Sequence, residues 1–115
     1  MSSVYLSVII PAYNEERNLS STVKEVAAYL LKQDYSCELI IVDDGSRDNT
    51  LKIAEACRDI FKDLKIISYP MNRGKGFAVN KGIFEAQGDY ILFMDADNST
   101  SILEFEKFKP FLNTE

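Results

Sequence analysis

The chain has 115 residues, enough for one domain around a single hydrophobic core. Its net charge of −5 argues against a partner bound through a phosphate backbone, so we expect no nucleic acid partner. With no histidine, the sequence excludes mechanisms that use an imidazole base, and carboxylates or a metal must carry any chemistry.

The apolar residues alternate between short runs typical of strands and longer stretches with helical spacing. In chain order, the predicted elements are a strand over 6–10, a helix over 19–31, a strand over 38–42, a helix over 53–61, a strand over 64–69, a helix over 79–86, a strand over 90–94 and a helix over 102–112. Strands that alternate with helices form a mainly parallel sheet with right-handed crossovers. The sequence therefore predicts one Rossmann-like α/β domain over 1–115, of the order β-α-β-α-β-α-β-α. Its strands are apolar throughout, as expected for strands covered on both faces.

A few residues suggest where these elements begin and end. Pro11 is expected to stop the first strand, because proline offers no backbone N–H to a sheet. Ser46 or Asp48 is a plausible N-cap for the second helix. Gly88 is a natural residue to follow the end of the third helix.

Polar residues follow each of the four predicted strands, at the point where the strand ends. The clusters lie at 11–16, 43–46, 70–76 and 95–97. In an open α/β sheet, ligands bind outside the carboxyl ends of the strands. We therefore expect the four clusters to form one ligand site along this edge.

The acidic pair Asp95 and Asp97 is the candidate metal site. The two residues lie two positions apart, so in an extended chain both carboxylates face the same way. Hard carboxylate oxygens at the rim of a site suit Mg²⁺ or Mn²⁺, with water and phosphate oxygens as the other ligands. A solvated acidic loop is the alternative, but the position directly after a buried strand favours the metal.

Other residues in the clusters suit a nucleotide. Asp43 could accept hydrogen bonds from a base or a ribose, whereas Ser46 is expected to be structural. Arg73 and Lys75 lie among glycines before a helix, an arrangement that favours an anion, although a plain surface turn is the alternative. Tyr13 could stack on a base or simply pack. The usual glycine-rich NAD, flavin and P-loop patterns are absent from the sequence.

Four segments, in order along the chain, resemble family 2 glycosyltransferases. They are SVIIPAYNE at 7–15, IVDDGSRD at 41–48, NRGKG at 72–76 and GDYILFMDAD at 88–97. The spacing of GKGFAV at 74–79 and DADNST at 95–100 is most similar to the dolichyl-phosphate glucosyltransferases and mannosyltransferases. Ser99 stands where mannosyl relatives often carry Gln, which favours the glucosyl type.

The resemblance implies the GT-A fold, an inverting transfer, a UDP- or GDP-hexose donor and a divalent metal, Mg²⁺ or Mn²⁺. The residues it implies are Pro11, Tyr13 and Glu15 in the nucleoside pocket, Asp43 at the base, Arg73 or Lys75 at the rim of the base or the diphosphate, and Asp95 and Asp97 on the metal. The acceptor would be a lipid phosphate or a saccharide.

The family's catalytic domain continues well past the D-x-D motif, and that later part usually supplies the catalytic base. We therefore expect this chain to be the nucleotide-sugar-binding portion, truncated after the D-x-D strand, with donor binding but little transfer on its own. No residue here is assigned as the base. The sequence shows no signal peptide and no transmembrane segment. It predicts a cytoplasmic location, with the cytoplasmic face of a membrane as the alternative for a full-length enzyme.

Three alternatives stay open at this point. A haloacid-dehalogenase-like phosphatase also has an apolar strand followed by D-x-D, but on its first strand. A response-regulator receiver also places its acidic pair after the first strand. A non-catalytic nucleotide-binding fragment is the third.

Overall fold

A computed structural model describes residues 3–99 and 101–107 of the protein. The elements are β1 (Leu6–Ala12), α1 (Leu19–Leu31), β2 (Cys37–Asp44), α2 (Thr50–Ala56), the 3-10 helix η1 (Cys57–Asp59), β3 (Leu64–Tyr69), α3 (Lys75–Glu85), β4 (Tyr90–Phe93) and the 3-10 helix η2 (Ile102–Lys107). The predicted alternation of strands and helices is confirmed over the described residues.

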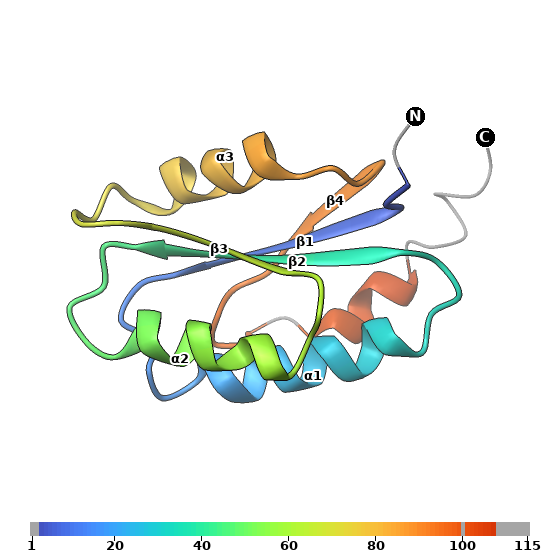
Figure 1. The fold of residues 1–115 in the computed structure, drawn as a ribbon, viewed down its shortest axis with the longest axis horizontal. Helices are drawn as coiled ribbons and strands as arrows, with labels where there is room; N and C mark the ends of the chain where they lie inside the picture. Colours follow the sequence, from blue (N-terminus) through green and yellow to red (C-terminus); the bar gives the residue numbers. More distant parts are fainter. Residues whose placement is uncertain (1–2, 100, 108–115) are drawn as a thin grey trace.

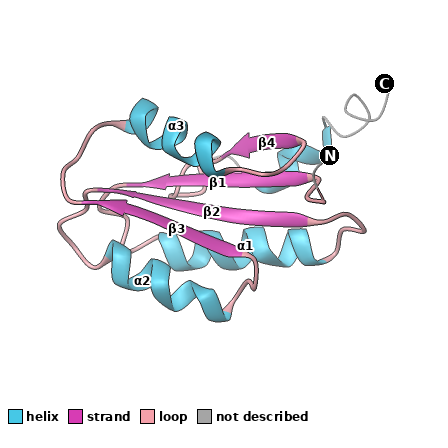
Figure 2. Ribbon diagram, turned by 45° about the horizontal axis from the view of Figure 1, so that its top comes forward, coloured by secondary structure: helices cyan, strands magenta, loops and turns pink. Residues whose placement is uncertain are grey.

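The four strands form one parallel sheet in the order β3-β2-β1-β4. In Figure 2 all four arrowheads point the same way, so the carboxyl ends of the strands share one edge. From β1 the chain moves outward to β2 and β3, and then returns across the sheet to place β4 on the other side of β1. The order of strands therefore reverses between β1 and β4, and in doubly wound sheets a ligand crevice opens at such a reversal.

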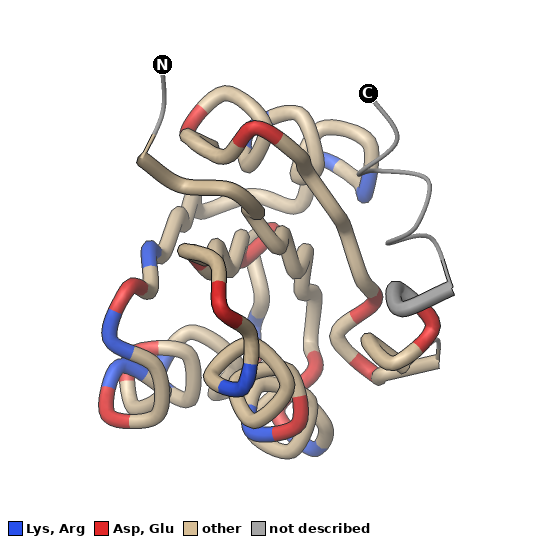
Figure 3. The backbone as a smooth tube through the Cα atoms, turned by 90° about the vertical axis from the view of Figure 1, so that its right-hand side faces the viewer, with Lys and Arg blue, Asp and Glu red and all other residues tan. Residues whose placement is uncertain are grey.

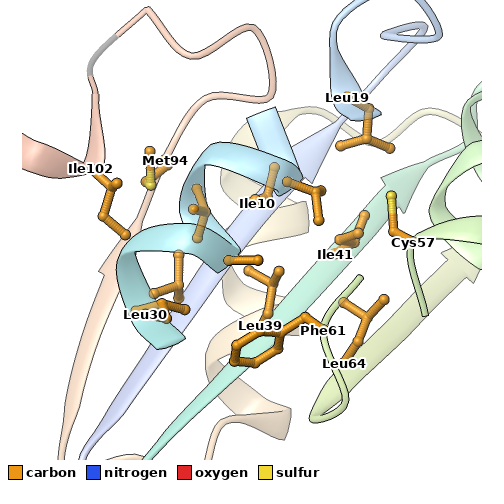
Figure 4. Packing of buried hydrophobic residues seen from close by; sticks show 14 of the residues in the cluster. Ile10, Leu19, Leu30, Leu39, Ile41, Cys57, Phe61, Leu64, Met94 and Ile102 are labelled. Carbon is orange, nitrogen blue, oxygen red and sulfur yellow. The ribbon is translucent and has the colours of Figure 1, made fainter. Parts of the chain in front are cut away.

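The helices form two layers around the sheet. Helices α1, α2 and η2 cover one face, and α3 covers the other (Figure 1). The larger core lies between the sheet and the α1 layer, where Figure 4 shows Phe61 beside Leu39 of β2. A smaller cluster under α3 contains Ile9, Ile40 and Ala78. The central strand β2 is buried at all eight positions, as its continuous apolar run predicts.

The edge strand β4 departs from the expectation of strands covered on both faces. Tyr90 and Leu92 pack against the larger core, whereas Ile91 and Phe93 are 40% and 55% exposed. Because side chains alternate between the two faces of a strand, these exposed residues lie on the α3 side of the sheet. Helix α3 is centred over β1 and β2, and it leaves this part of β4 uncovered.

Pro11 does not stop the first strand, contrary to the sequence prediction. Strand β1 continues through Pro11 to Ala12, in register with β2 up to Asp43. The carbonyl of Ile9 accepts the N–H of Met94, so alternation along the strand turns the Pro11 nitrogen toward the β4 side as well. Strand β4 pairs only as far as Phe93, opposite Ile9, so the missing N–H of proline costs no ladder bond.

Two predicted helix ends also need correction. The N-cap of α2 is Asn49, and neither Ser46 nor Asp48. The Asp48 carboxylate accepts the N–H of Thr50 at 2.9 Å just before the helix, and the Ser46 hydroxyl accepts the N–H of Asn14. Gly88 does not follow the end of α3 directly, because the helix ends at Glu85 and the chain is extended from Ala86. Gly88 is instead required by close packing: a Cβ there would lie 2.5 Å from the Ser7 hydroxyl and 2.7 Å from its nitrogen.

The last predicted helix differs in type. Residues 102–107 form a 3-10 helix rather than an α-helix, and its Leu103 N–H donates to the Ser101 hydroxyl at 3.2 Å. The remainder of the predicted helix, at 108–112, lies outside the described residues.

Along the helices of the domain, Figure 3 shows Lys and Arg positions interspersed with Asp and Glu.

Candidate functional site

A cavity of about 310 Å³ opens at the carboxyl edge of the sheet, beside the reversal between β1 and β4. The described residues that line it are Pro11, Tyr13, Glu15, Asp44, Asn72, Gly74, Lys75, Ala78, Asp95, Ala96 and Asp97. All four predicted polar clusters contribute to this lining. The structure therefore brings together six of the eight predicted donor-site residues, and it adds Asp44, Asn72 and Gly74.

The first two loops of the site, which follow β1 and β2, are joined to each other by hydrogen bonds. The N–H groups of Asn14 and Glu15 donate to the hydroxyls of Ser46 and Thr50, at 2.9 and 2.8 Å. In return, the N–H of Arg47 donates to the Asn14 side-chain oxygen at 2.9 Å. Asn14 has a φ of 53°, in the left-handed region that asparagine tolerates better than most residues. These bonds fix the backbone that presents Tyr13, a residue that is 43% exposed at the cavity.

The buried carboxylate of Asp44 organises the third loop of the site, residues 70–74 between β3 and α3. Its Oδ1 accepts the Tyr69 hydroxyl at 2.6 Å and the N–H of Arg73 at 2.9 Å. Its Oδ2 accepts the Asn72 side-chain amide at 2.8 Å and the N–H of Gly74 at 2.9 Å. Burial, together with the hydrogen bond to this carboxylate, raises the pKa of Tyr69. Asp44 thus holds the segment that leads into α3.

Gly45 allows the third loop to lie directly on the end of β2. Its φ is 69°, and a Cβ at this position would meet the backbone of Met71 and Asn72 at 2.4 Å. Any side chain here would push the loop away from the Asp44 carboxylate. Gly45 is therefore required by both its conformation and its packing.

The D-x-D loop is anchored to α1. Ala96 is buried, and its carbonyl accepts the hydroxyl of Thr22 at 2.7 Å inside the protein. The side-chain amide of Asn98 donates to Glu25 at 3.0 Å. With the middle residue held inward, Asp95 and Asp97 are left facing the cavity. Thr22 was not expected from the sequence, where it reads as an ordinary helix residue.

Lys75 and Asp95 form an ion pair across the cavity. The Lys75 Nζ lies 2.5 Å from Asp95 Oδ1, and the Ser99 hydroxyl donates to Asp95 Oδ2 at 2.9 Å. The bond from Lys75 and the bond from Ser99 hold the pKa of Asp95 below its usual value. Asp97 is more exposed, and its Oδ1 accepts the N–H of Ser99 at 3.0 Å.

Two of the predicted donor-site residues lie elsewhere. Asp43 is 2% exposed, and its carboxylate accepts the Ser46 N–H and the Ser68 hydroxyl, each at 3.2 Å. Arg73 lines a neighbouring cavity, with its guanidinium 5.1 Å from the centre of the Phe77 ring. The described lining of the D-x-D cavity includes neither residue, so their contact with a base or diphosphate stays a prediction.

The side-chain oxygens at the cavity suit a hard divalent cation whose coordination shell is completed by its substrate. Asp95 and Asp97 supply carboxylate oxygens, and the ammonium of Lys75 shows that a cation is held at Asp95. Within the described ranges, no three His, Cys, Asp or Glu side chains are grouped as a complete metal site. The residues present therefore fit a metal whose remaining ligands are water and phosphate oxygens. In the same part of the chain, no helix has both the length and the apolar character needed to span a bilayer.

The fold and the cavity define a parallel α/β domain with a cavity lined by polar residues at its switch point. The family model named Glycosyl transferase family 2 matches residues 7–115, and the chain therefore belongs to glycosyl transferase family 2. This membership replaces the phosphatase and receiver alternatives, both of which place their acidic motif after a first strand. The D-x-D here follows β4, the fourth strand.

Individual relatives agree with the family. The dolichyl-phosphate beta-glucosyltransferase of Homo sapiens is 41% identical over 115 residues, which cover 94% of this chain and 36% of that protein. The structure of S. aureus TarS in complex with UDP-GlcNAc matches with a TM-score of 0.74 at 31% identity, covering 94% of this chain and 32% of that one. The structure of glucosyl-3-phosphoglycerate synthase from Mycobacterium tuberculosis, in complex with Mn²⁺, UDP and glucosyl-3-phosphoglycerate, has a TM-score of 0.73 at 28% identity, covering 97% and 41%.

These matches confirm the predicted GT-A fold and the resemblance to the glucosyl type. The chain spans about a third of the length of the curated relatives that it matches.

Proposed function

We propose that this protein binds a UDP- or GDP-hexose together with Mg²⁺ or Mn²⁺ and serves as the donor site of an inverting hexosyltransferase. The observation that carries the proposal is the cavity at which Tyr13, Asp44, Lys75, Asp95 and Asp97 meet. Support also comes from two solved relatives, one bound to UDP-GlcNAc and the other to UDP and Mn²⁺.

Each part of the cavity has a separate task. The exposed ring of Tyr13 offers a flat apolar surface for a base, on a backbone fixed by the second loop. The Asp95 and Asp97 carboxylates would hold the metal, which when bound would neutralise negative charge on the departing diphosphate. Lys75, at the start of α3, adds a positive charge and a helix N-terminus on the same side of the cavity.

A lipid phosphate is the acceptor class that best suits the proposed reaction. Its oxygen is already ionised near neutral pH, so attack on the anomeric carbon from the face opposite the diphosphate requires little help from a base. A saccharide hydroxyl would need a base, and no side chain at the described cavity is assigned that role. The acceptor, the stereochemical outcome and a cytoplasmic location all remain proposals.

Calorimetric titration tests the donor site. We expect UDP or GDP to bind more tightly with Mn²⁺ than without it, and Asp95→Ala to remove that metal dependence. Asp89→Ala is the matched control, because it removes an exposed carboxylate at the other end of β4, outside the cavity lining. Metal-dependent binding that survives unchanged in Asp95→Ala would contradict the metal role. Absence of binding by the unaltered protein, with either nucleotide, would reject the donor site itself.

A further inference from the structure

The Asp95 carboxylate already has a partner on each oxygen. Lys75 Nζ lies against Oδ1, and the Ser99 hydroxyl donates to Oδ2. A metal ligated by Asp95 would need to approach one of these oxygens to about 2.1 Å. A divalent ion at that distance from Oδ1 would stand beside the ammonium, and the repulsion between two cations makes joint occupation unfavourable. The metal and Lys75 therefore compete for Asp95.

The backbone at Lys75 is fixed, whereas most of its side chain is exposed to solvent. The two preceding residues, Arg73 and Gly74, donate their N–H groups to the buried Asp44 carboxylate, and Lys75 is the first residue of α3. The Lys75 side chain is 62% exposed and lines the same cavity as both metal-site aspartates. A rotation of this side chain about a fixed anchor can therefore move the ammonium from Asp95 to another anion in the cavity.

We propose that Lys75 is an exchangeable counter-ion that couples metal binding to nucleotide binding. In the donor-free protein, its ammonium neutralises Asp95 and opposes the entry of a divalent ion. When a nucleoside diphosphate enters, the ammonium transfers to the diphosphate and leaves Asp95 to the metal. The inference rests on the proposed donor site and specifies how that site is filled.

The consequence is a thermodynamic linkage. Metal alone must displace Lys75 without offering it another anion, so its affinity is low. The diphosphate supplies that anion, so each ligand tightens the other by the same factor. Without Lys75, the metal would meet no competing cation at Asp95, and the nucleotide would lose one of its cationic contacts.

A matched control lies further along the same helix. The Lys81 ammonium is 5.5 Å from the centre of the Phe77 ring, at the neighbouring cavity rather than at Asp95. Lys81→Met removes one positive charge from α3, as does Lys75→Met. Any general effect of charge on metal affinity will therefore appear in both variants, whereas the exchange will appear only at Lys75.

The experiment measures Mn²⁺ binding from the electron paramagnetic resonance signal of the free ion, with and without saturating UDP. Without UDP, we expect Lys75→Met to bind Mn²⁺ about five-fold or more tightly than the unaltered protein, and Lys81→Met to stay within about two-fold. We expect UDP to tighten Mn²⁺ binding by about ten-fold or more in the unaltered protein. In Lys75→Met, we expect this tightening factor to be smaller by about five-fold or more.

Each outcome separates the exchange from the donor site. Equal or weaker Mn²⁺ binding by Lys75→Met without UDP overturns the exchange, while UDP-dependent Mn²⁺ binding by the unaltered protein keeps the donor site. Equal gains in Lys75→Met and Lys81→Met overturn it as well, because a general charge effect then explains both. Failure of the unaltered protein to bind Mn²⁺ even with UDP rejects both proposals. Lys75→Gln repeats the test with a polar side chain, and thermal unfolding checks that each variant is folded.

Discussion

Replacing Asp44 with asparagine tests whether one buried carboxylate holds the third loop of the site. All four of its partners are donors: the Tyr69 hydroxyl, the Asn72 amide and the N–H groups of Arg73 and Gly74. An asparagine at this position would offer one oxygen and one NH₂ group, so two of these donors would face another donor. The Tyr69 hydroxyl can rotate and the Asn72 amide can flip, but a backbone N–H cannot.

The cost follows from these four bonds. At least one backbone bond is lost, at about 2 kcal/mol for a charge-assisted hydrogen bond. The other three become neutral, and each loses roughly 1 kcal/mol. The loop lies at the surface, where water can replace part of this, so we expect about 3 kcal/mol in total. For a domain of 115 residues, this corresponds to a fall in Tm of roughly 12 °C.

Urea unfolding followed by circular dichroism measures this change. Tyr69→Phe is the matched control, since it removes one of the four bonds and is expected to cost about 1 kcal/mol. The double variant should cost less than the sum of the two, because both substitutions act on the same bond. A cost below about 1 kcal/mol for Asp44→Asn, or full additivity with Tyr69→Phe, would refute the role of Asp44 as the shared acceptor.

Two further predictions concern the opposite end of the sheet. Gly88→Ala places a Cβ 2.5 Å from the Ser7 hydroxyl and 2.9 Å from the carbonyl carbon of Leu6, so we expect a loss of roughly 2 kcal/mol in thermal unfolding. As a control, Gly76→Ala places a Cβ in α3 with nothing within 4 Å, so its stability should stay unchanged or rise by up to about 1 kcal/mol. Equal losses of stability in the two variants would contradict the packing argument. Burial raises the pKa of Glu38, but hydrogen bonds from Gln87 and Ser7 and the ion pair with Lys65 outweigh it, and the pKa lies below its usual value. Stability from this lowered pKa is present above the unfolded value of about 4.3 and is lost as the pH falls through the folded one, so urea unfolding should depend less on acid pH in Glu38→Gln than in the unaltered protein. Identical pH profiles would reject this assignment.

The alternation of apolar runs was sufficient to predict the layers of this fold. The run at 64–69 matches β3 at both ends, because a polar or proline residue bounds it on each side. The start of α3 was missed by four residues. Its first turn carries little apolar periodicity, and its position depends on hydrogen bonds from Arg73 and Gly74 to Asp44, which is 29 and 30 residues away in sequence.

The choice between the two adjacent aspartates could not be made from sequence. Neighbouring residues of a strand point to opposite faces, and the motif does not say which of Asp43 and Asp44 faces the ligand edge. In the folded protein Asp44 lines the cavity, whereas Asp43 is buried and accepts hydrogen bonds from Ser46 and Ser68. The third loop then closes over Asp44. In contrast, the position of Asp95 and Asp97 at the cavity could be predicted, because both directly follow a strand at its carboxyl end; their role at a metal stays a prediction.

The course of β1 through Pro11 places a residue without a backbone N–H at the mouth of the crevice. The Pro11 nitrogen points toward the β4 side but carries no hydrogen, so a longer β4 would find no donor there. The ladder between these strands ends at Phe93, two residues before Asp95. Another residue in place of Pro11 would carry a backbone N–H on this side of the strand. Proline therefore leaves no orphan backbone N–H at the mouth of the crevice, where such a group would otherwise need water or a ligand as its acceptor.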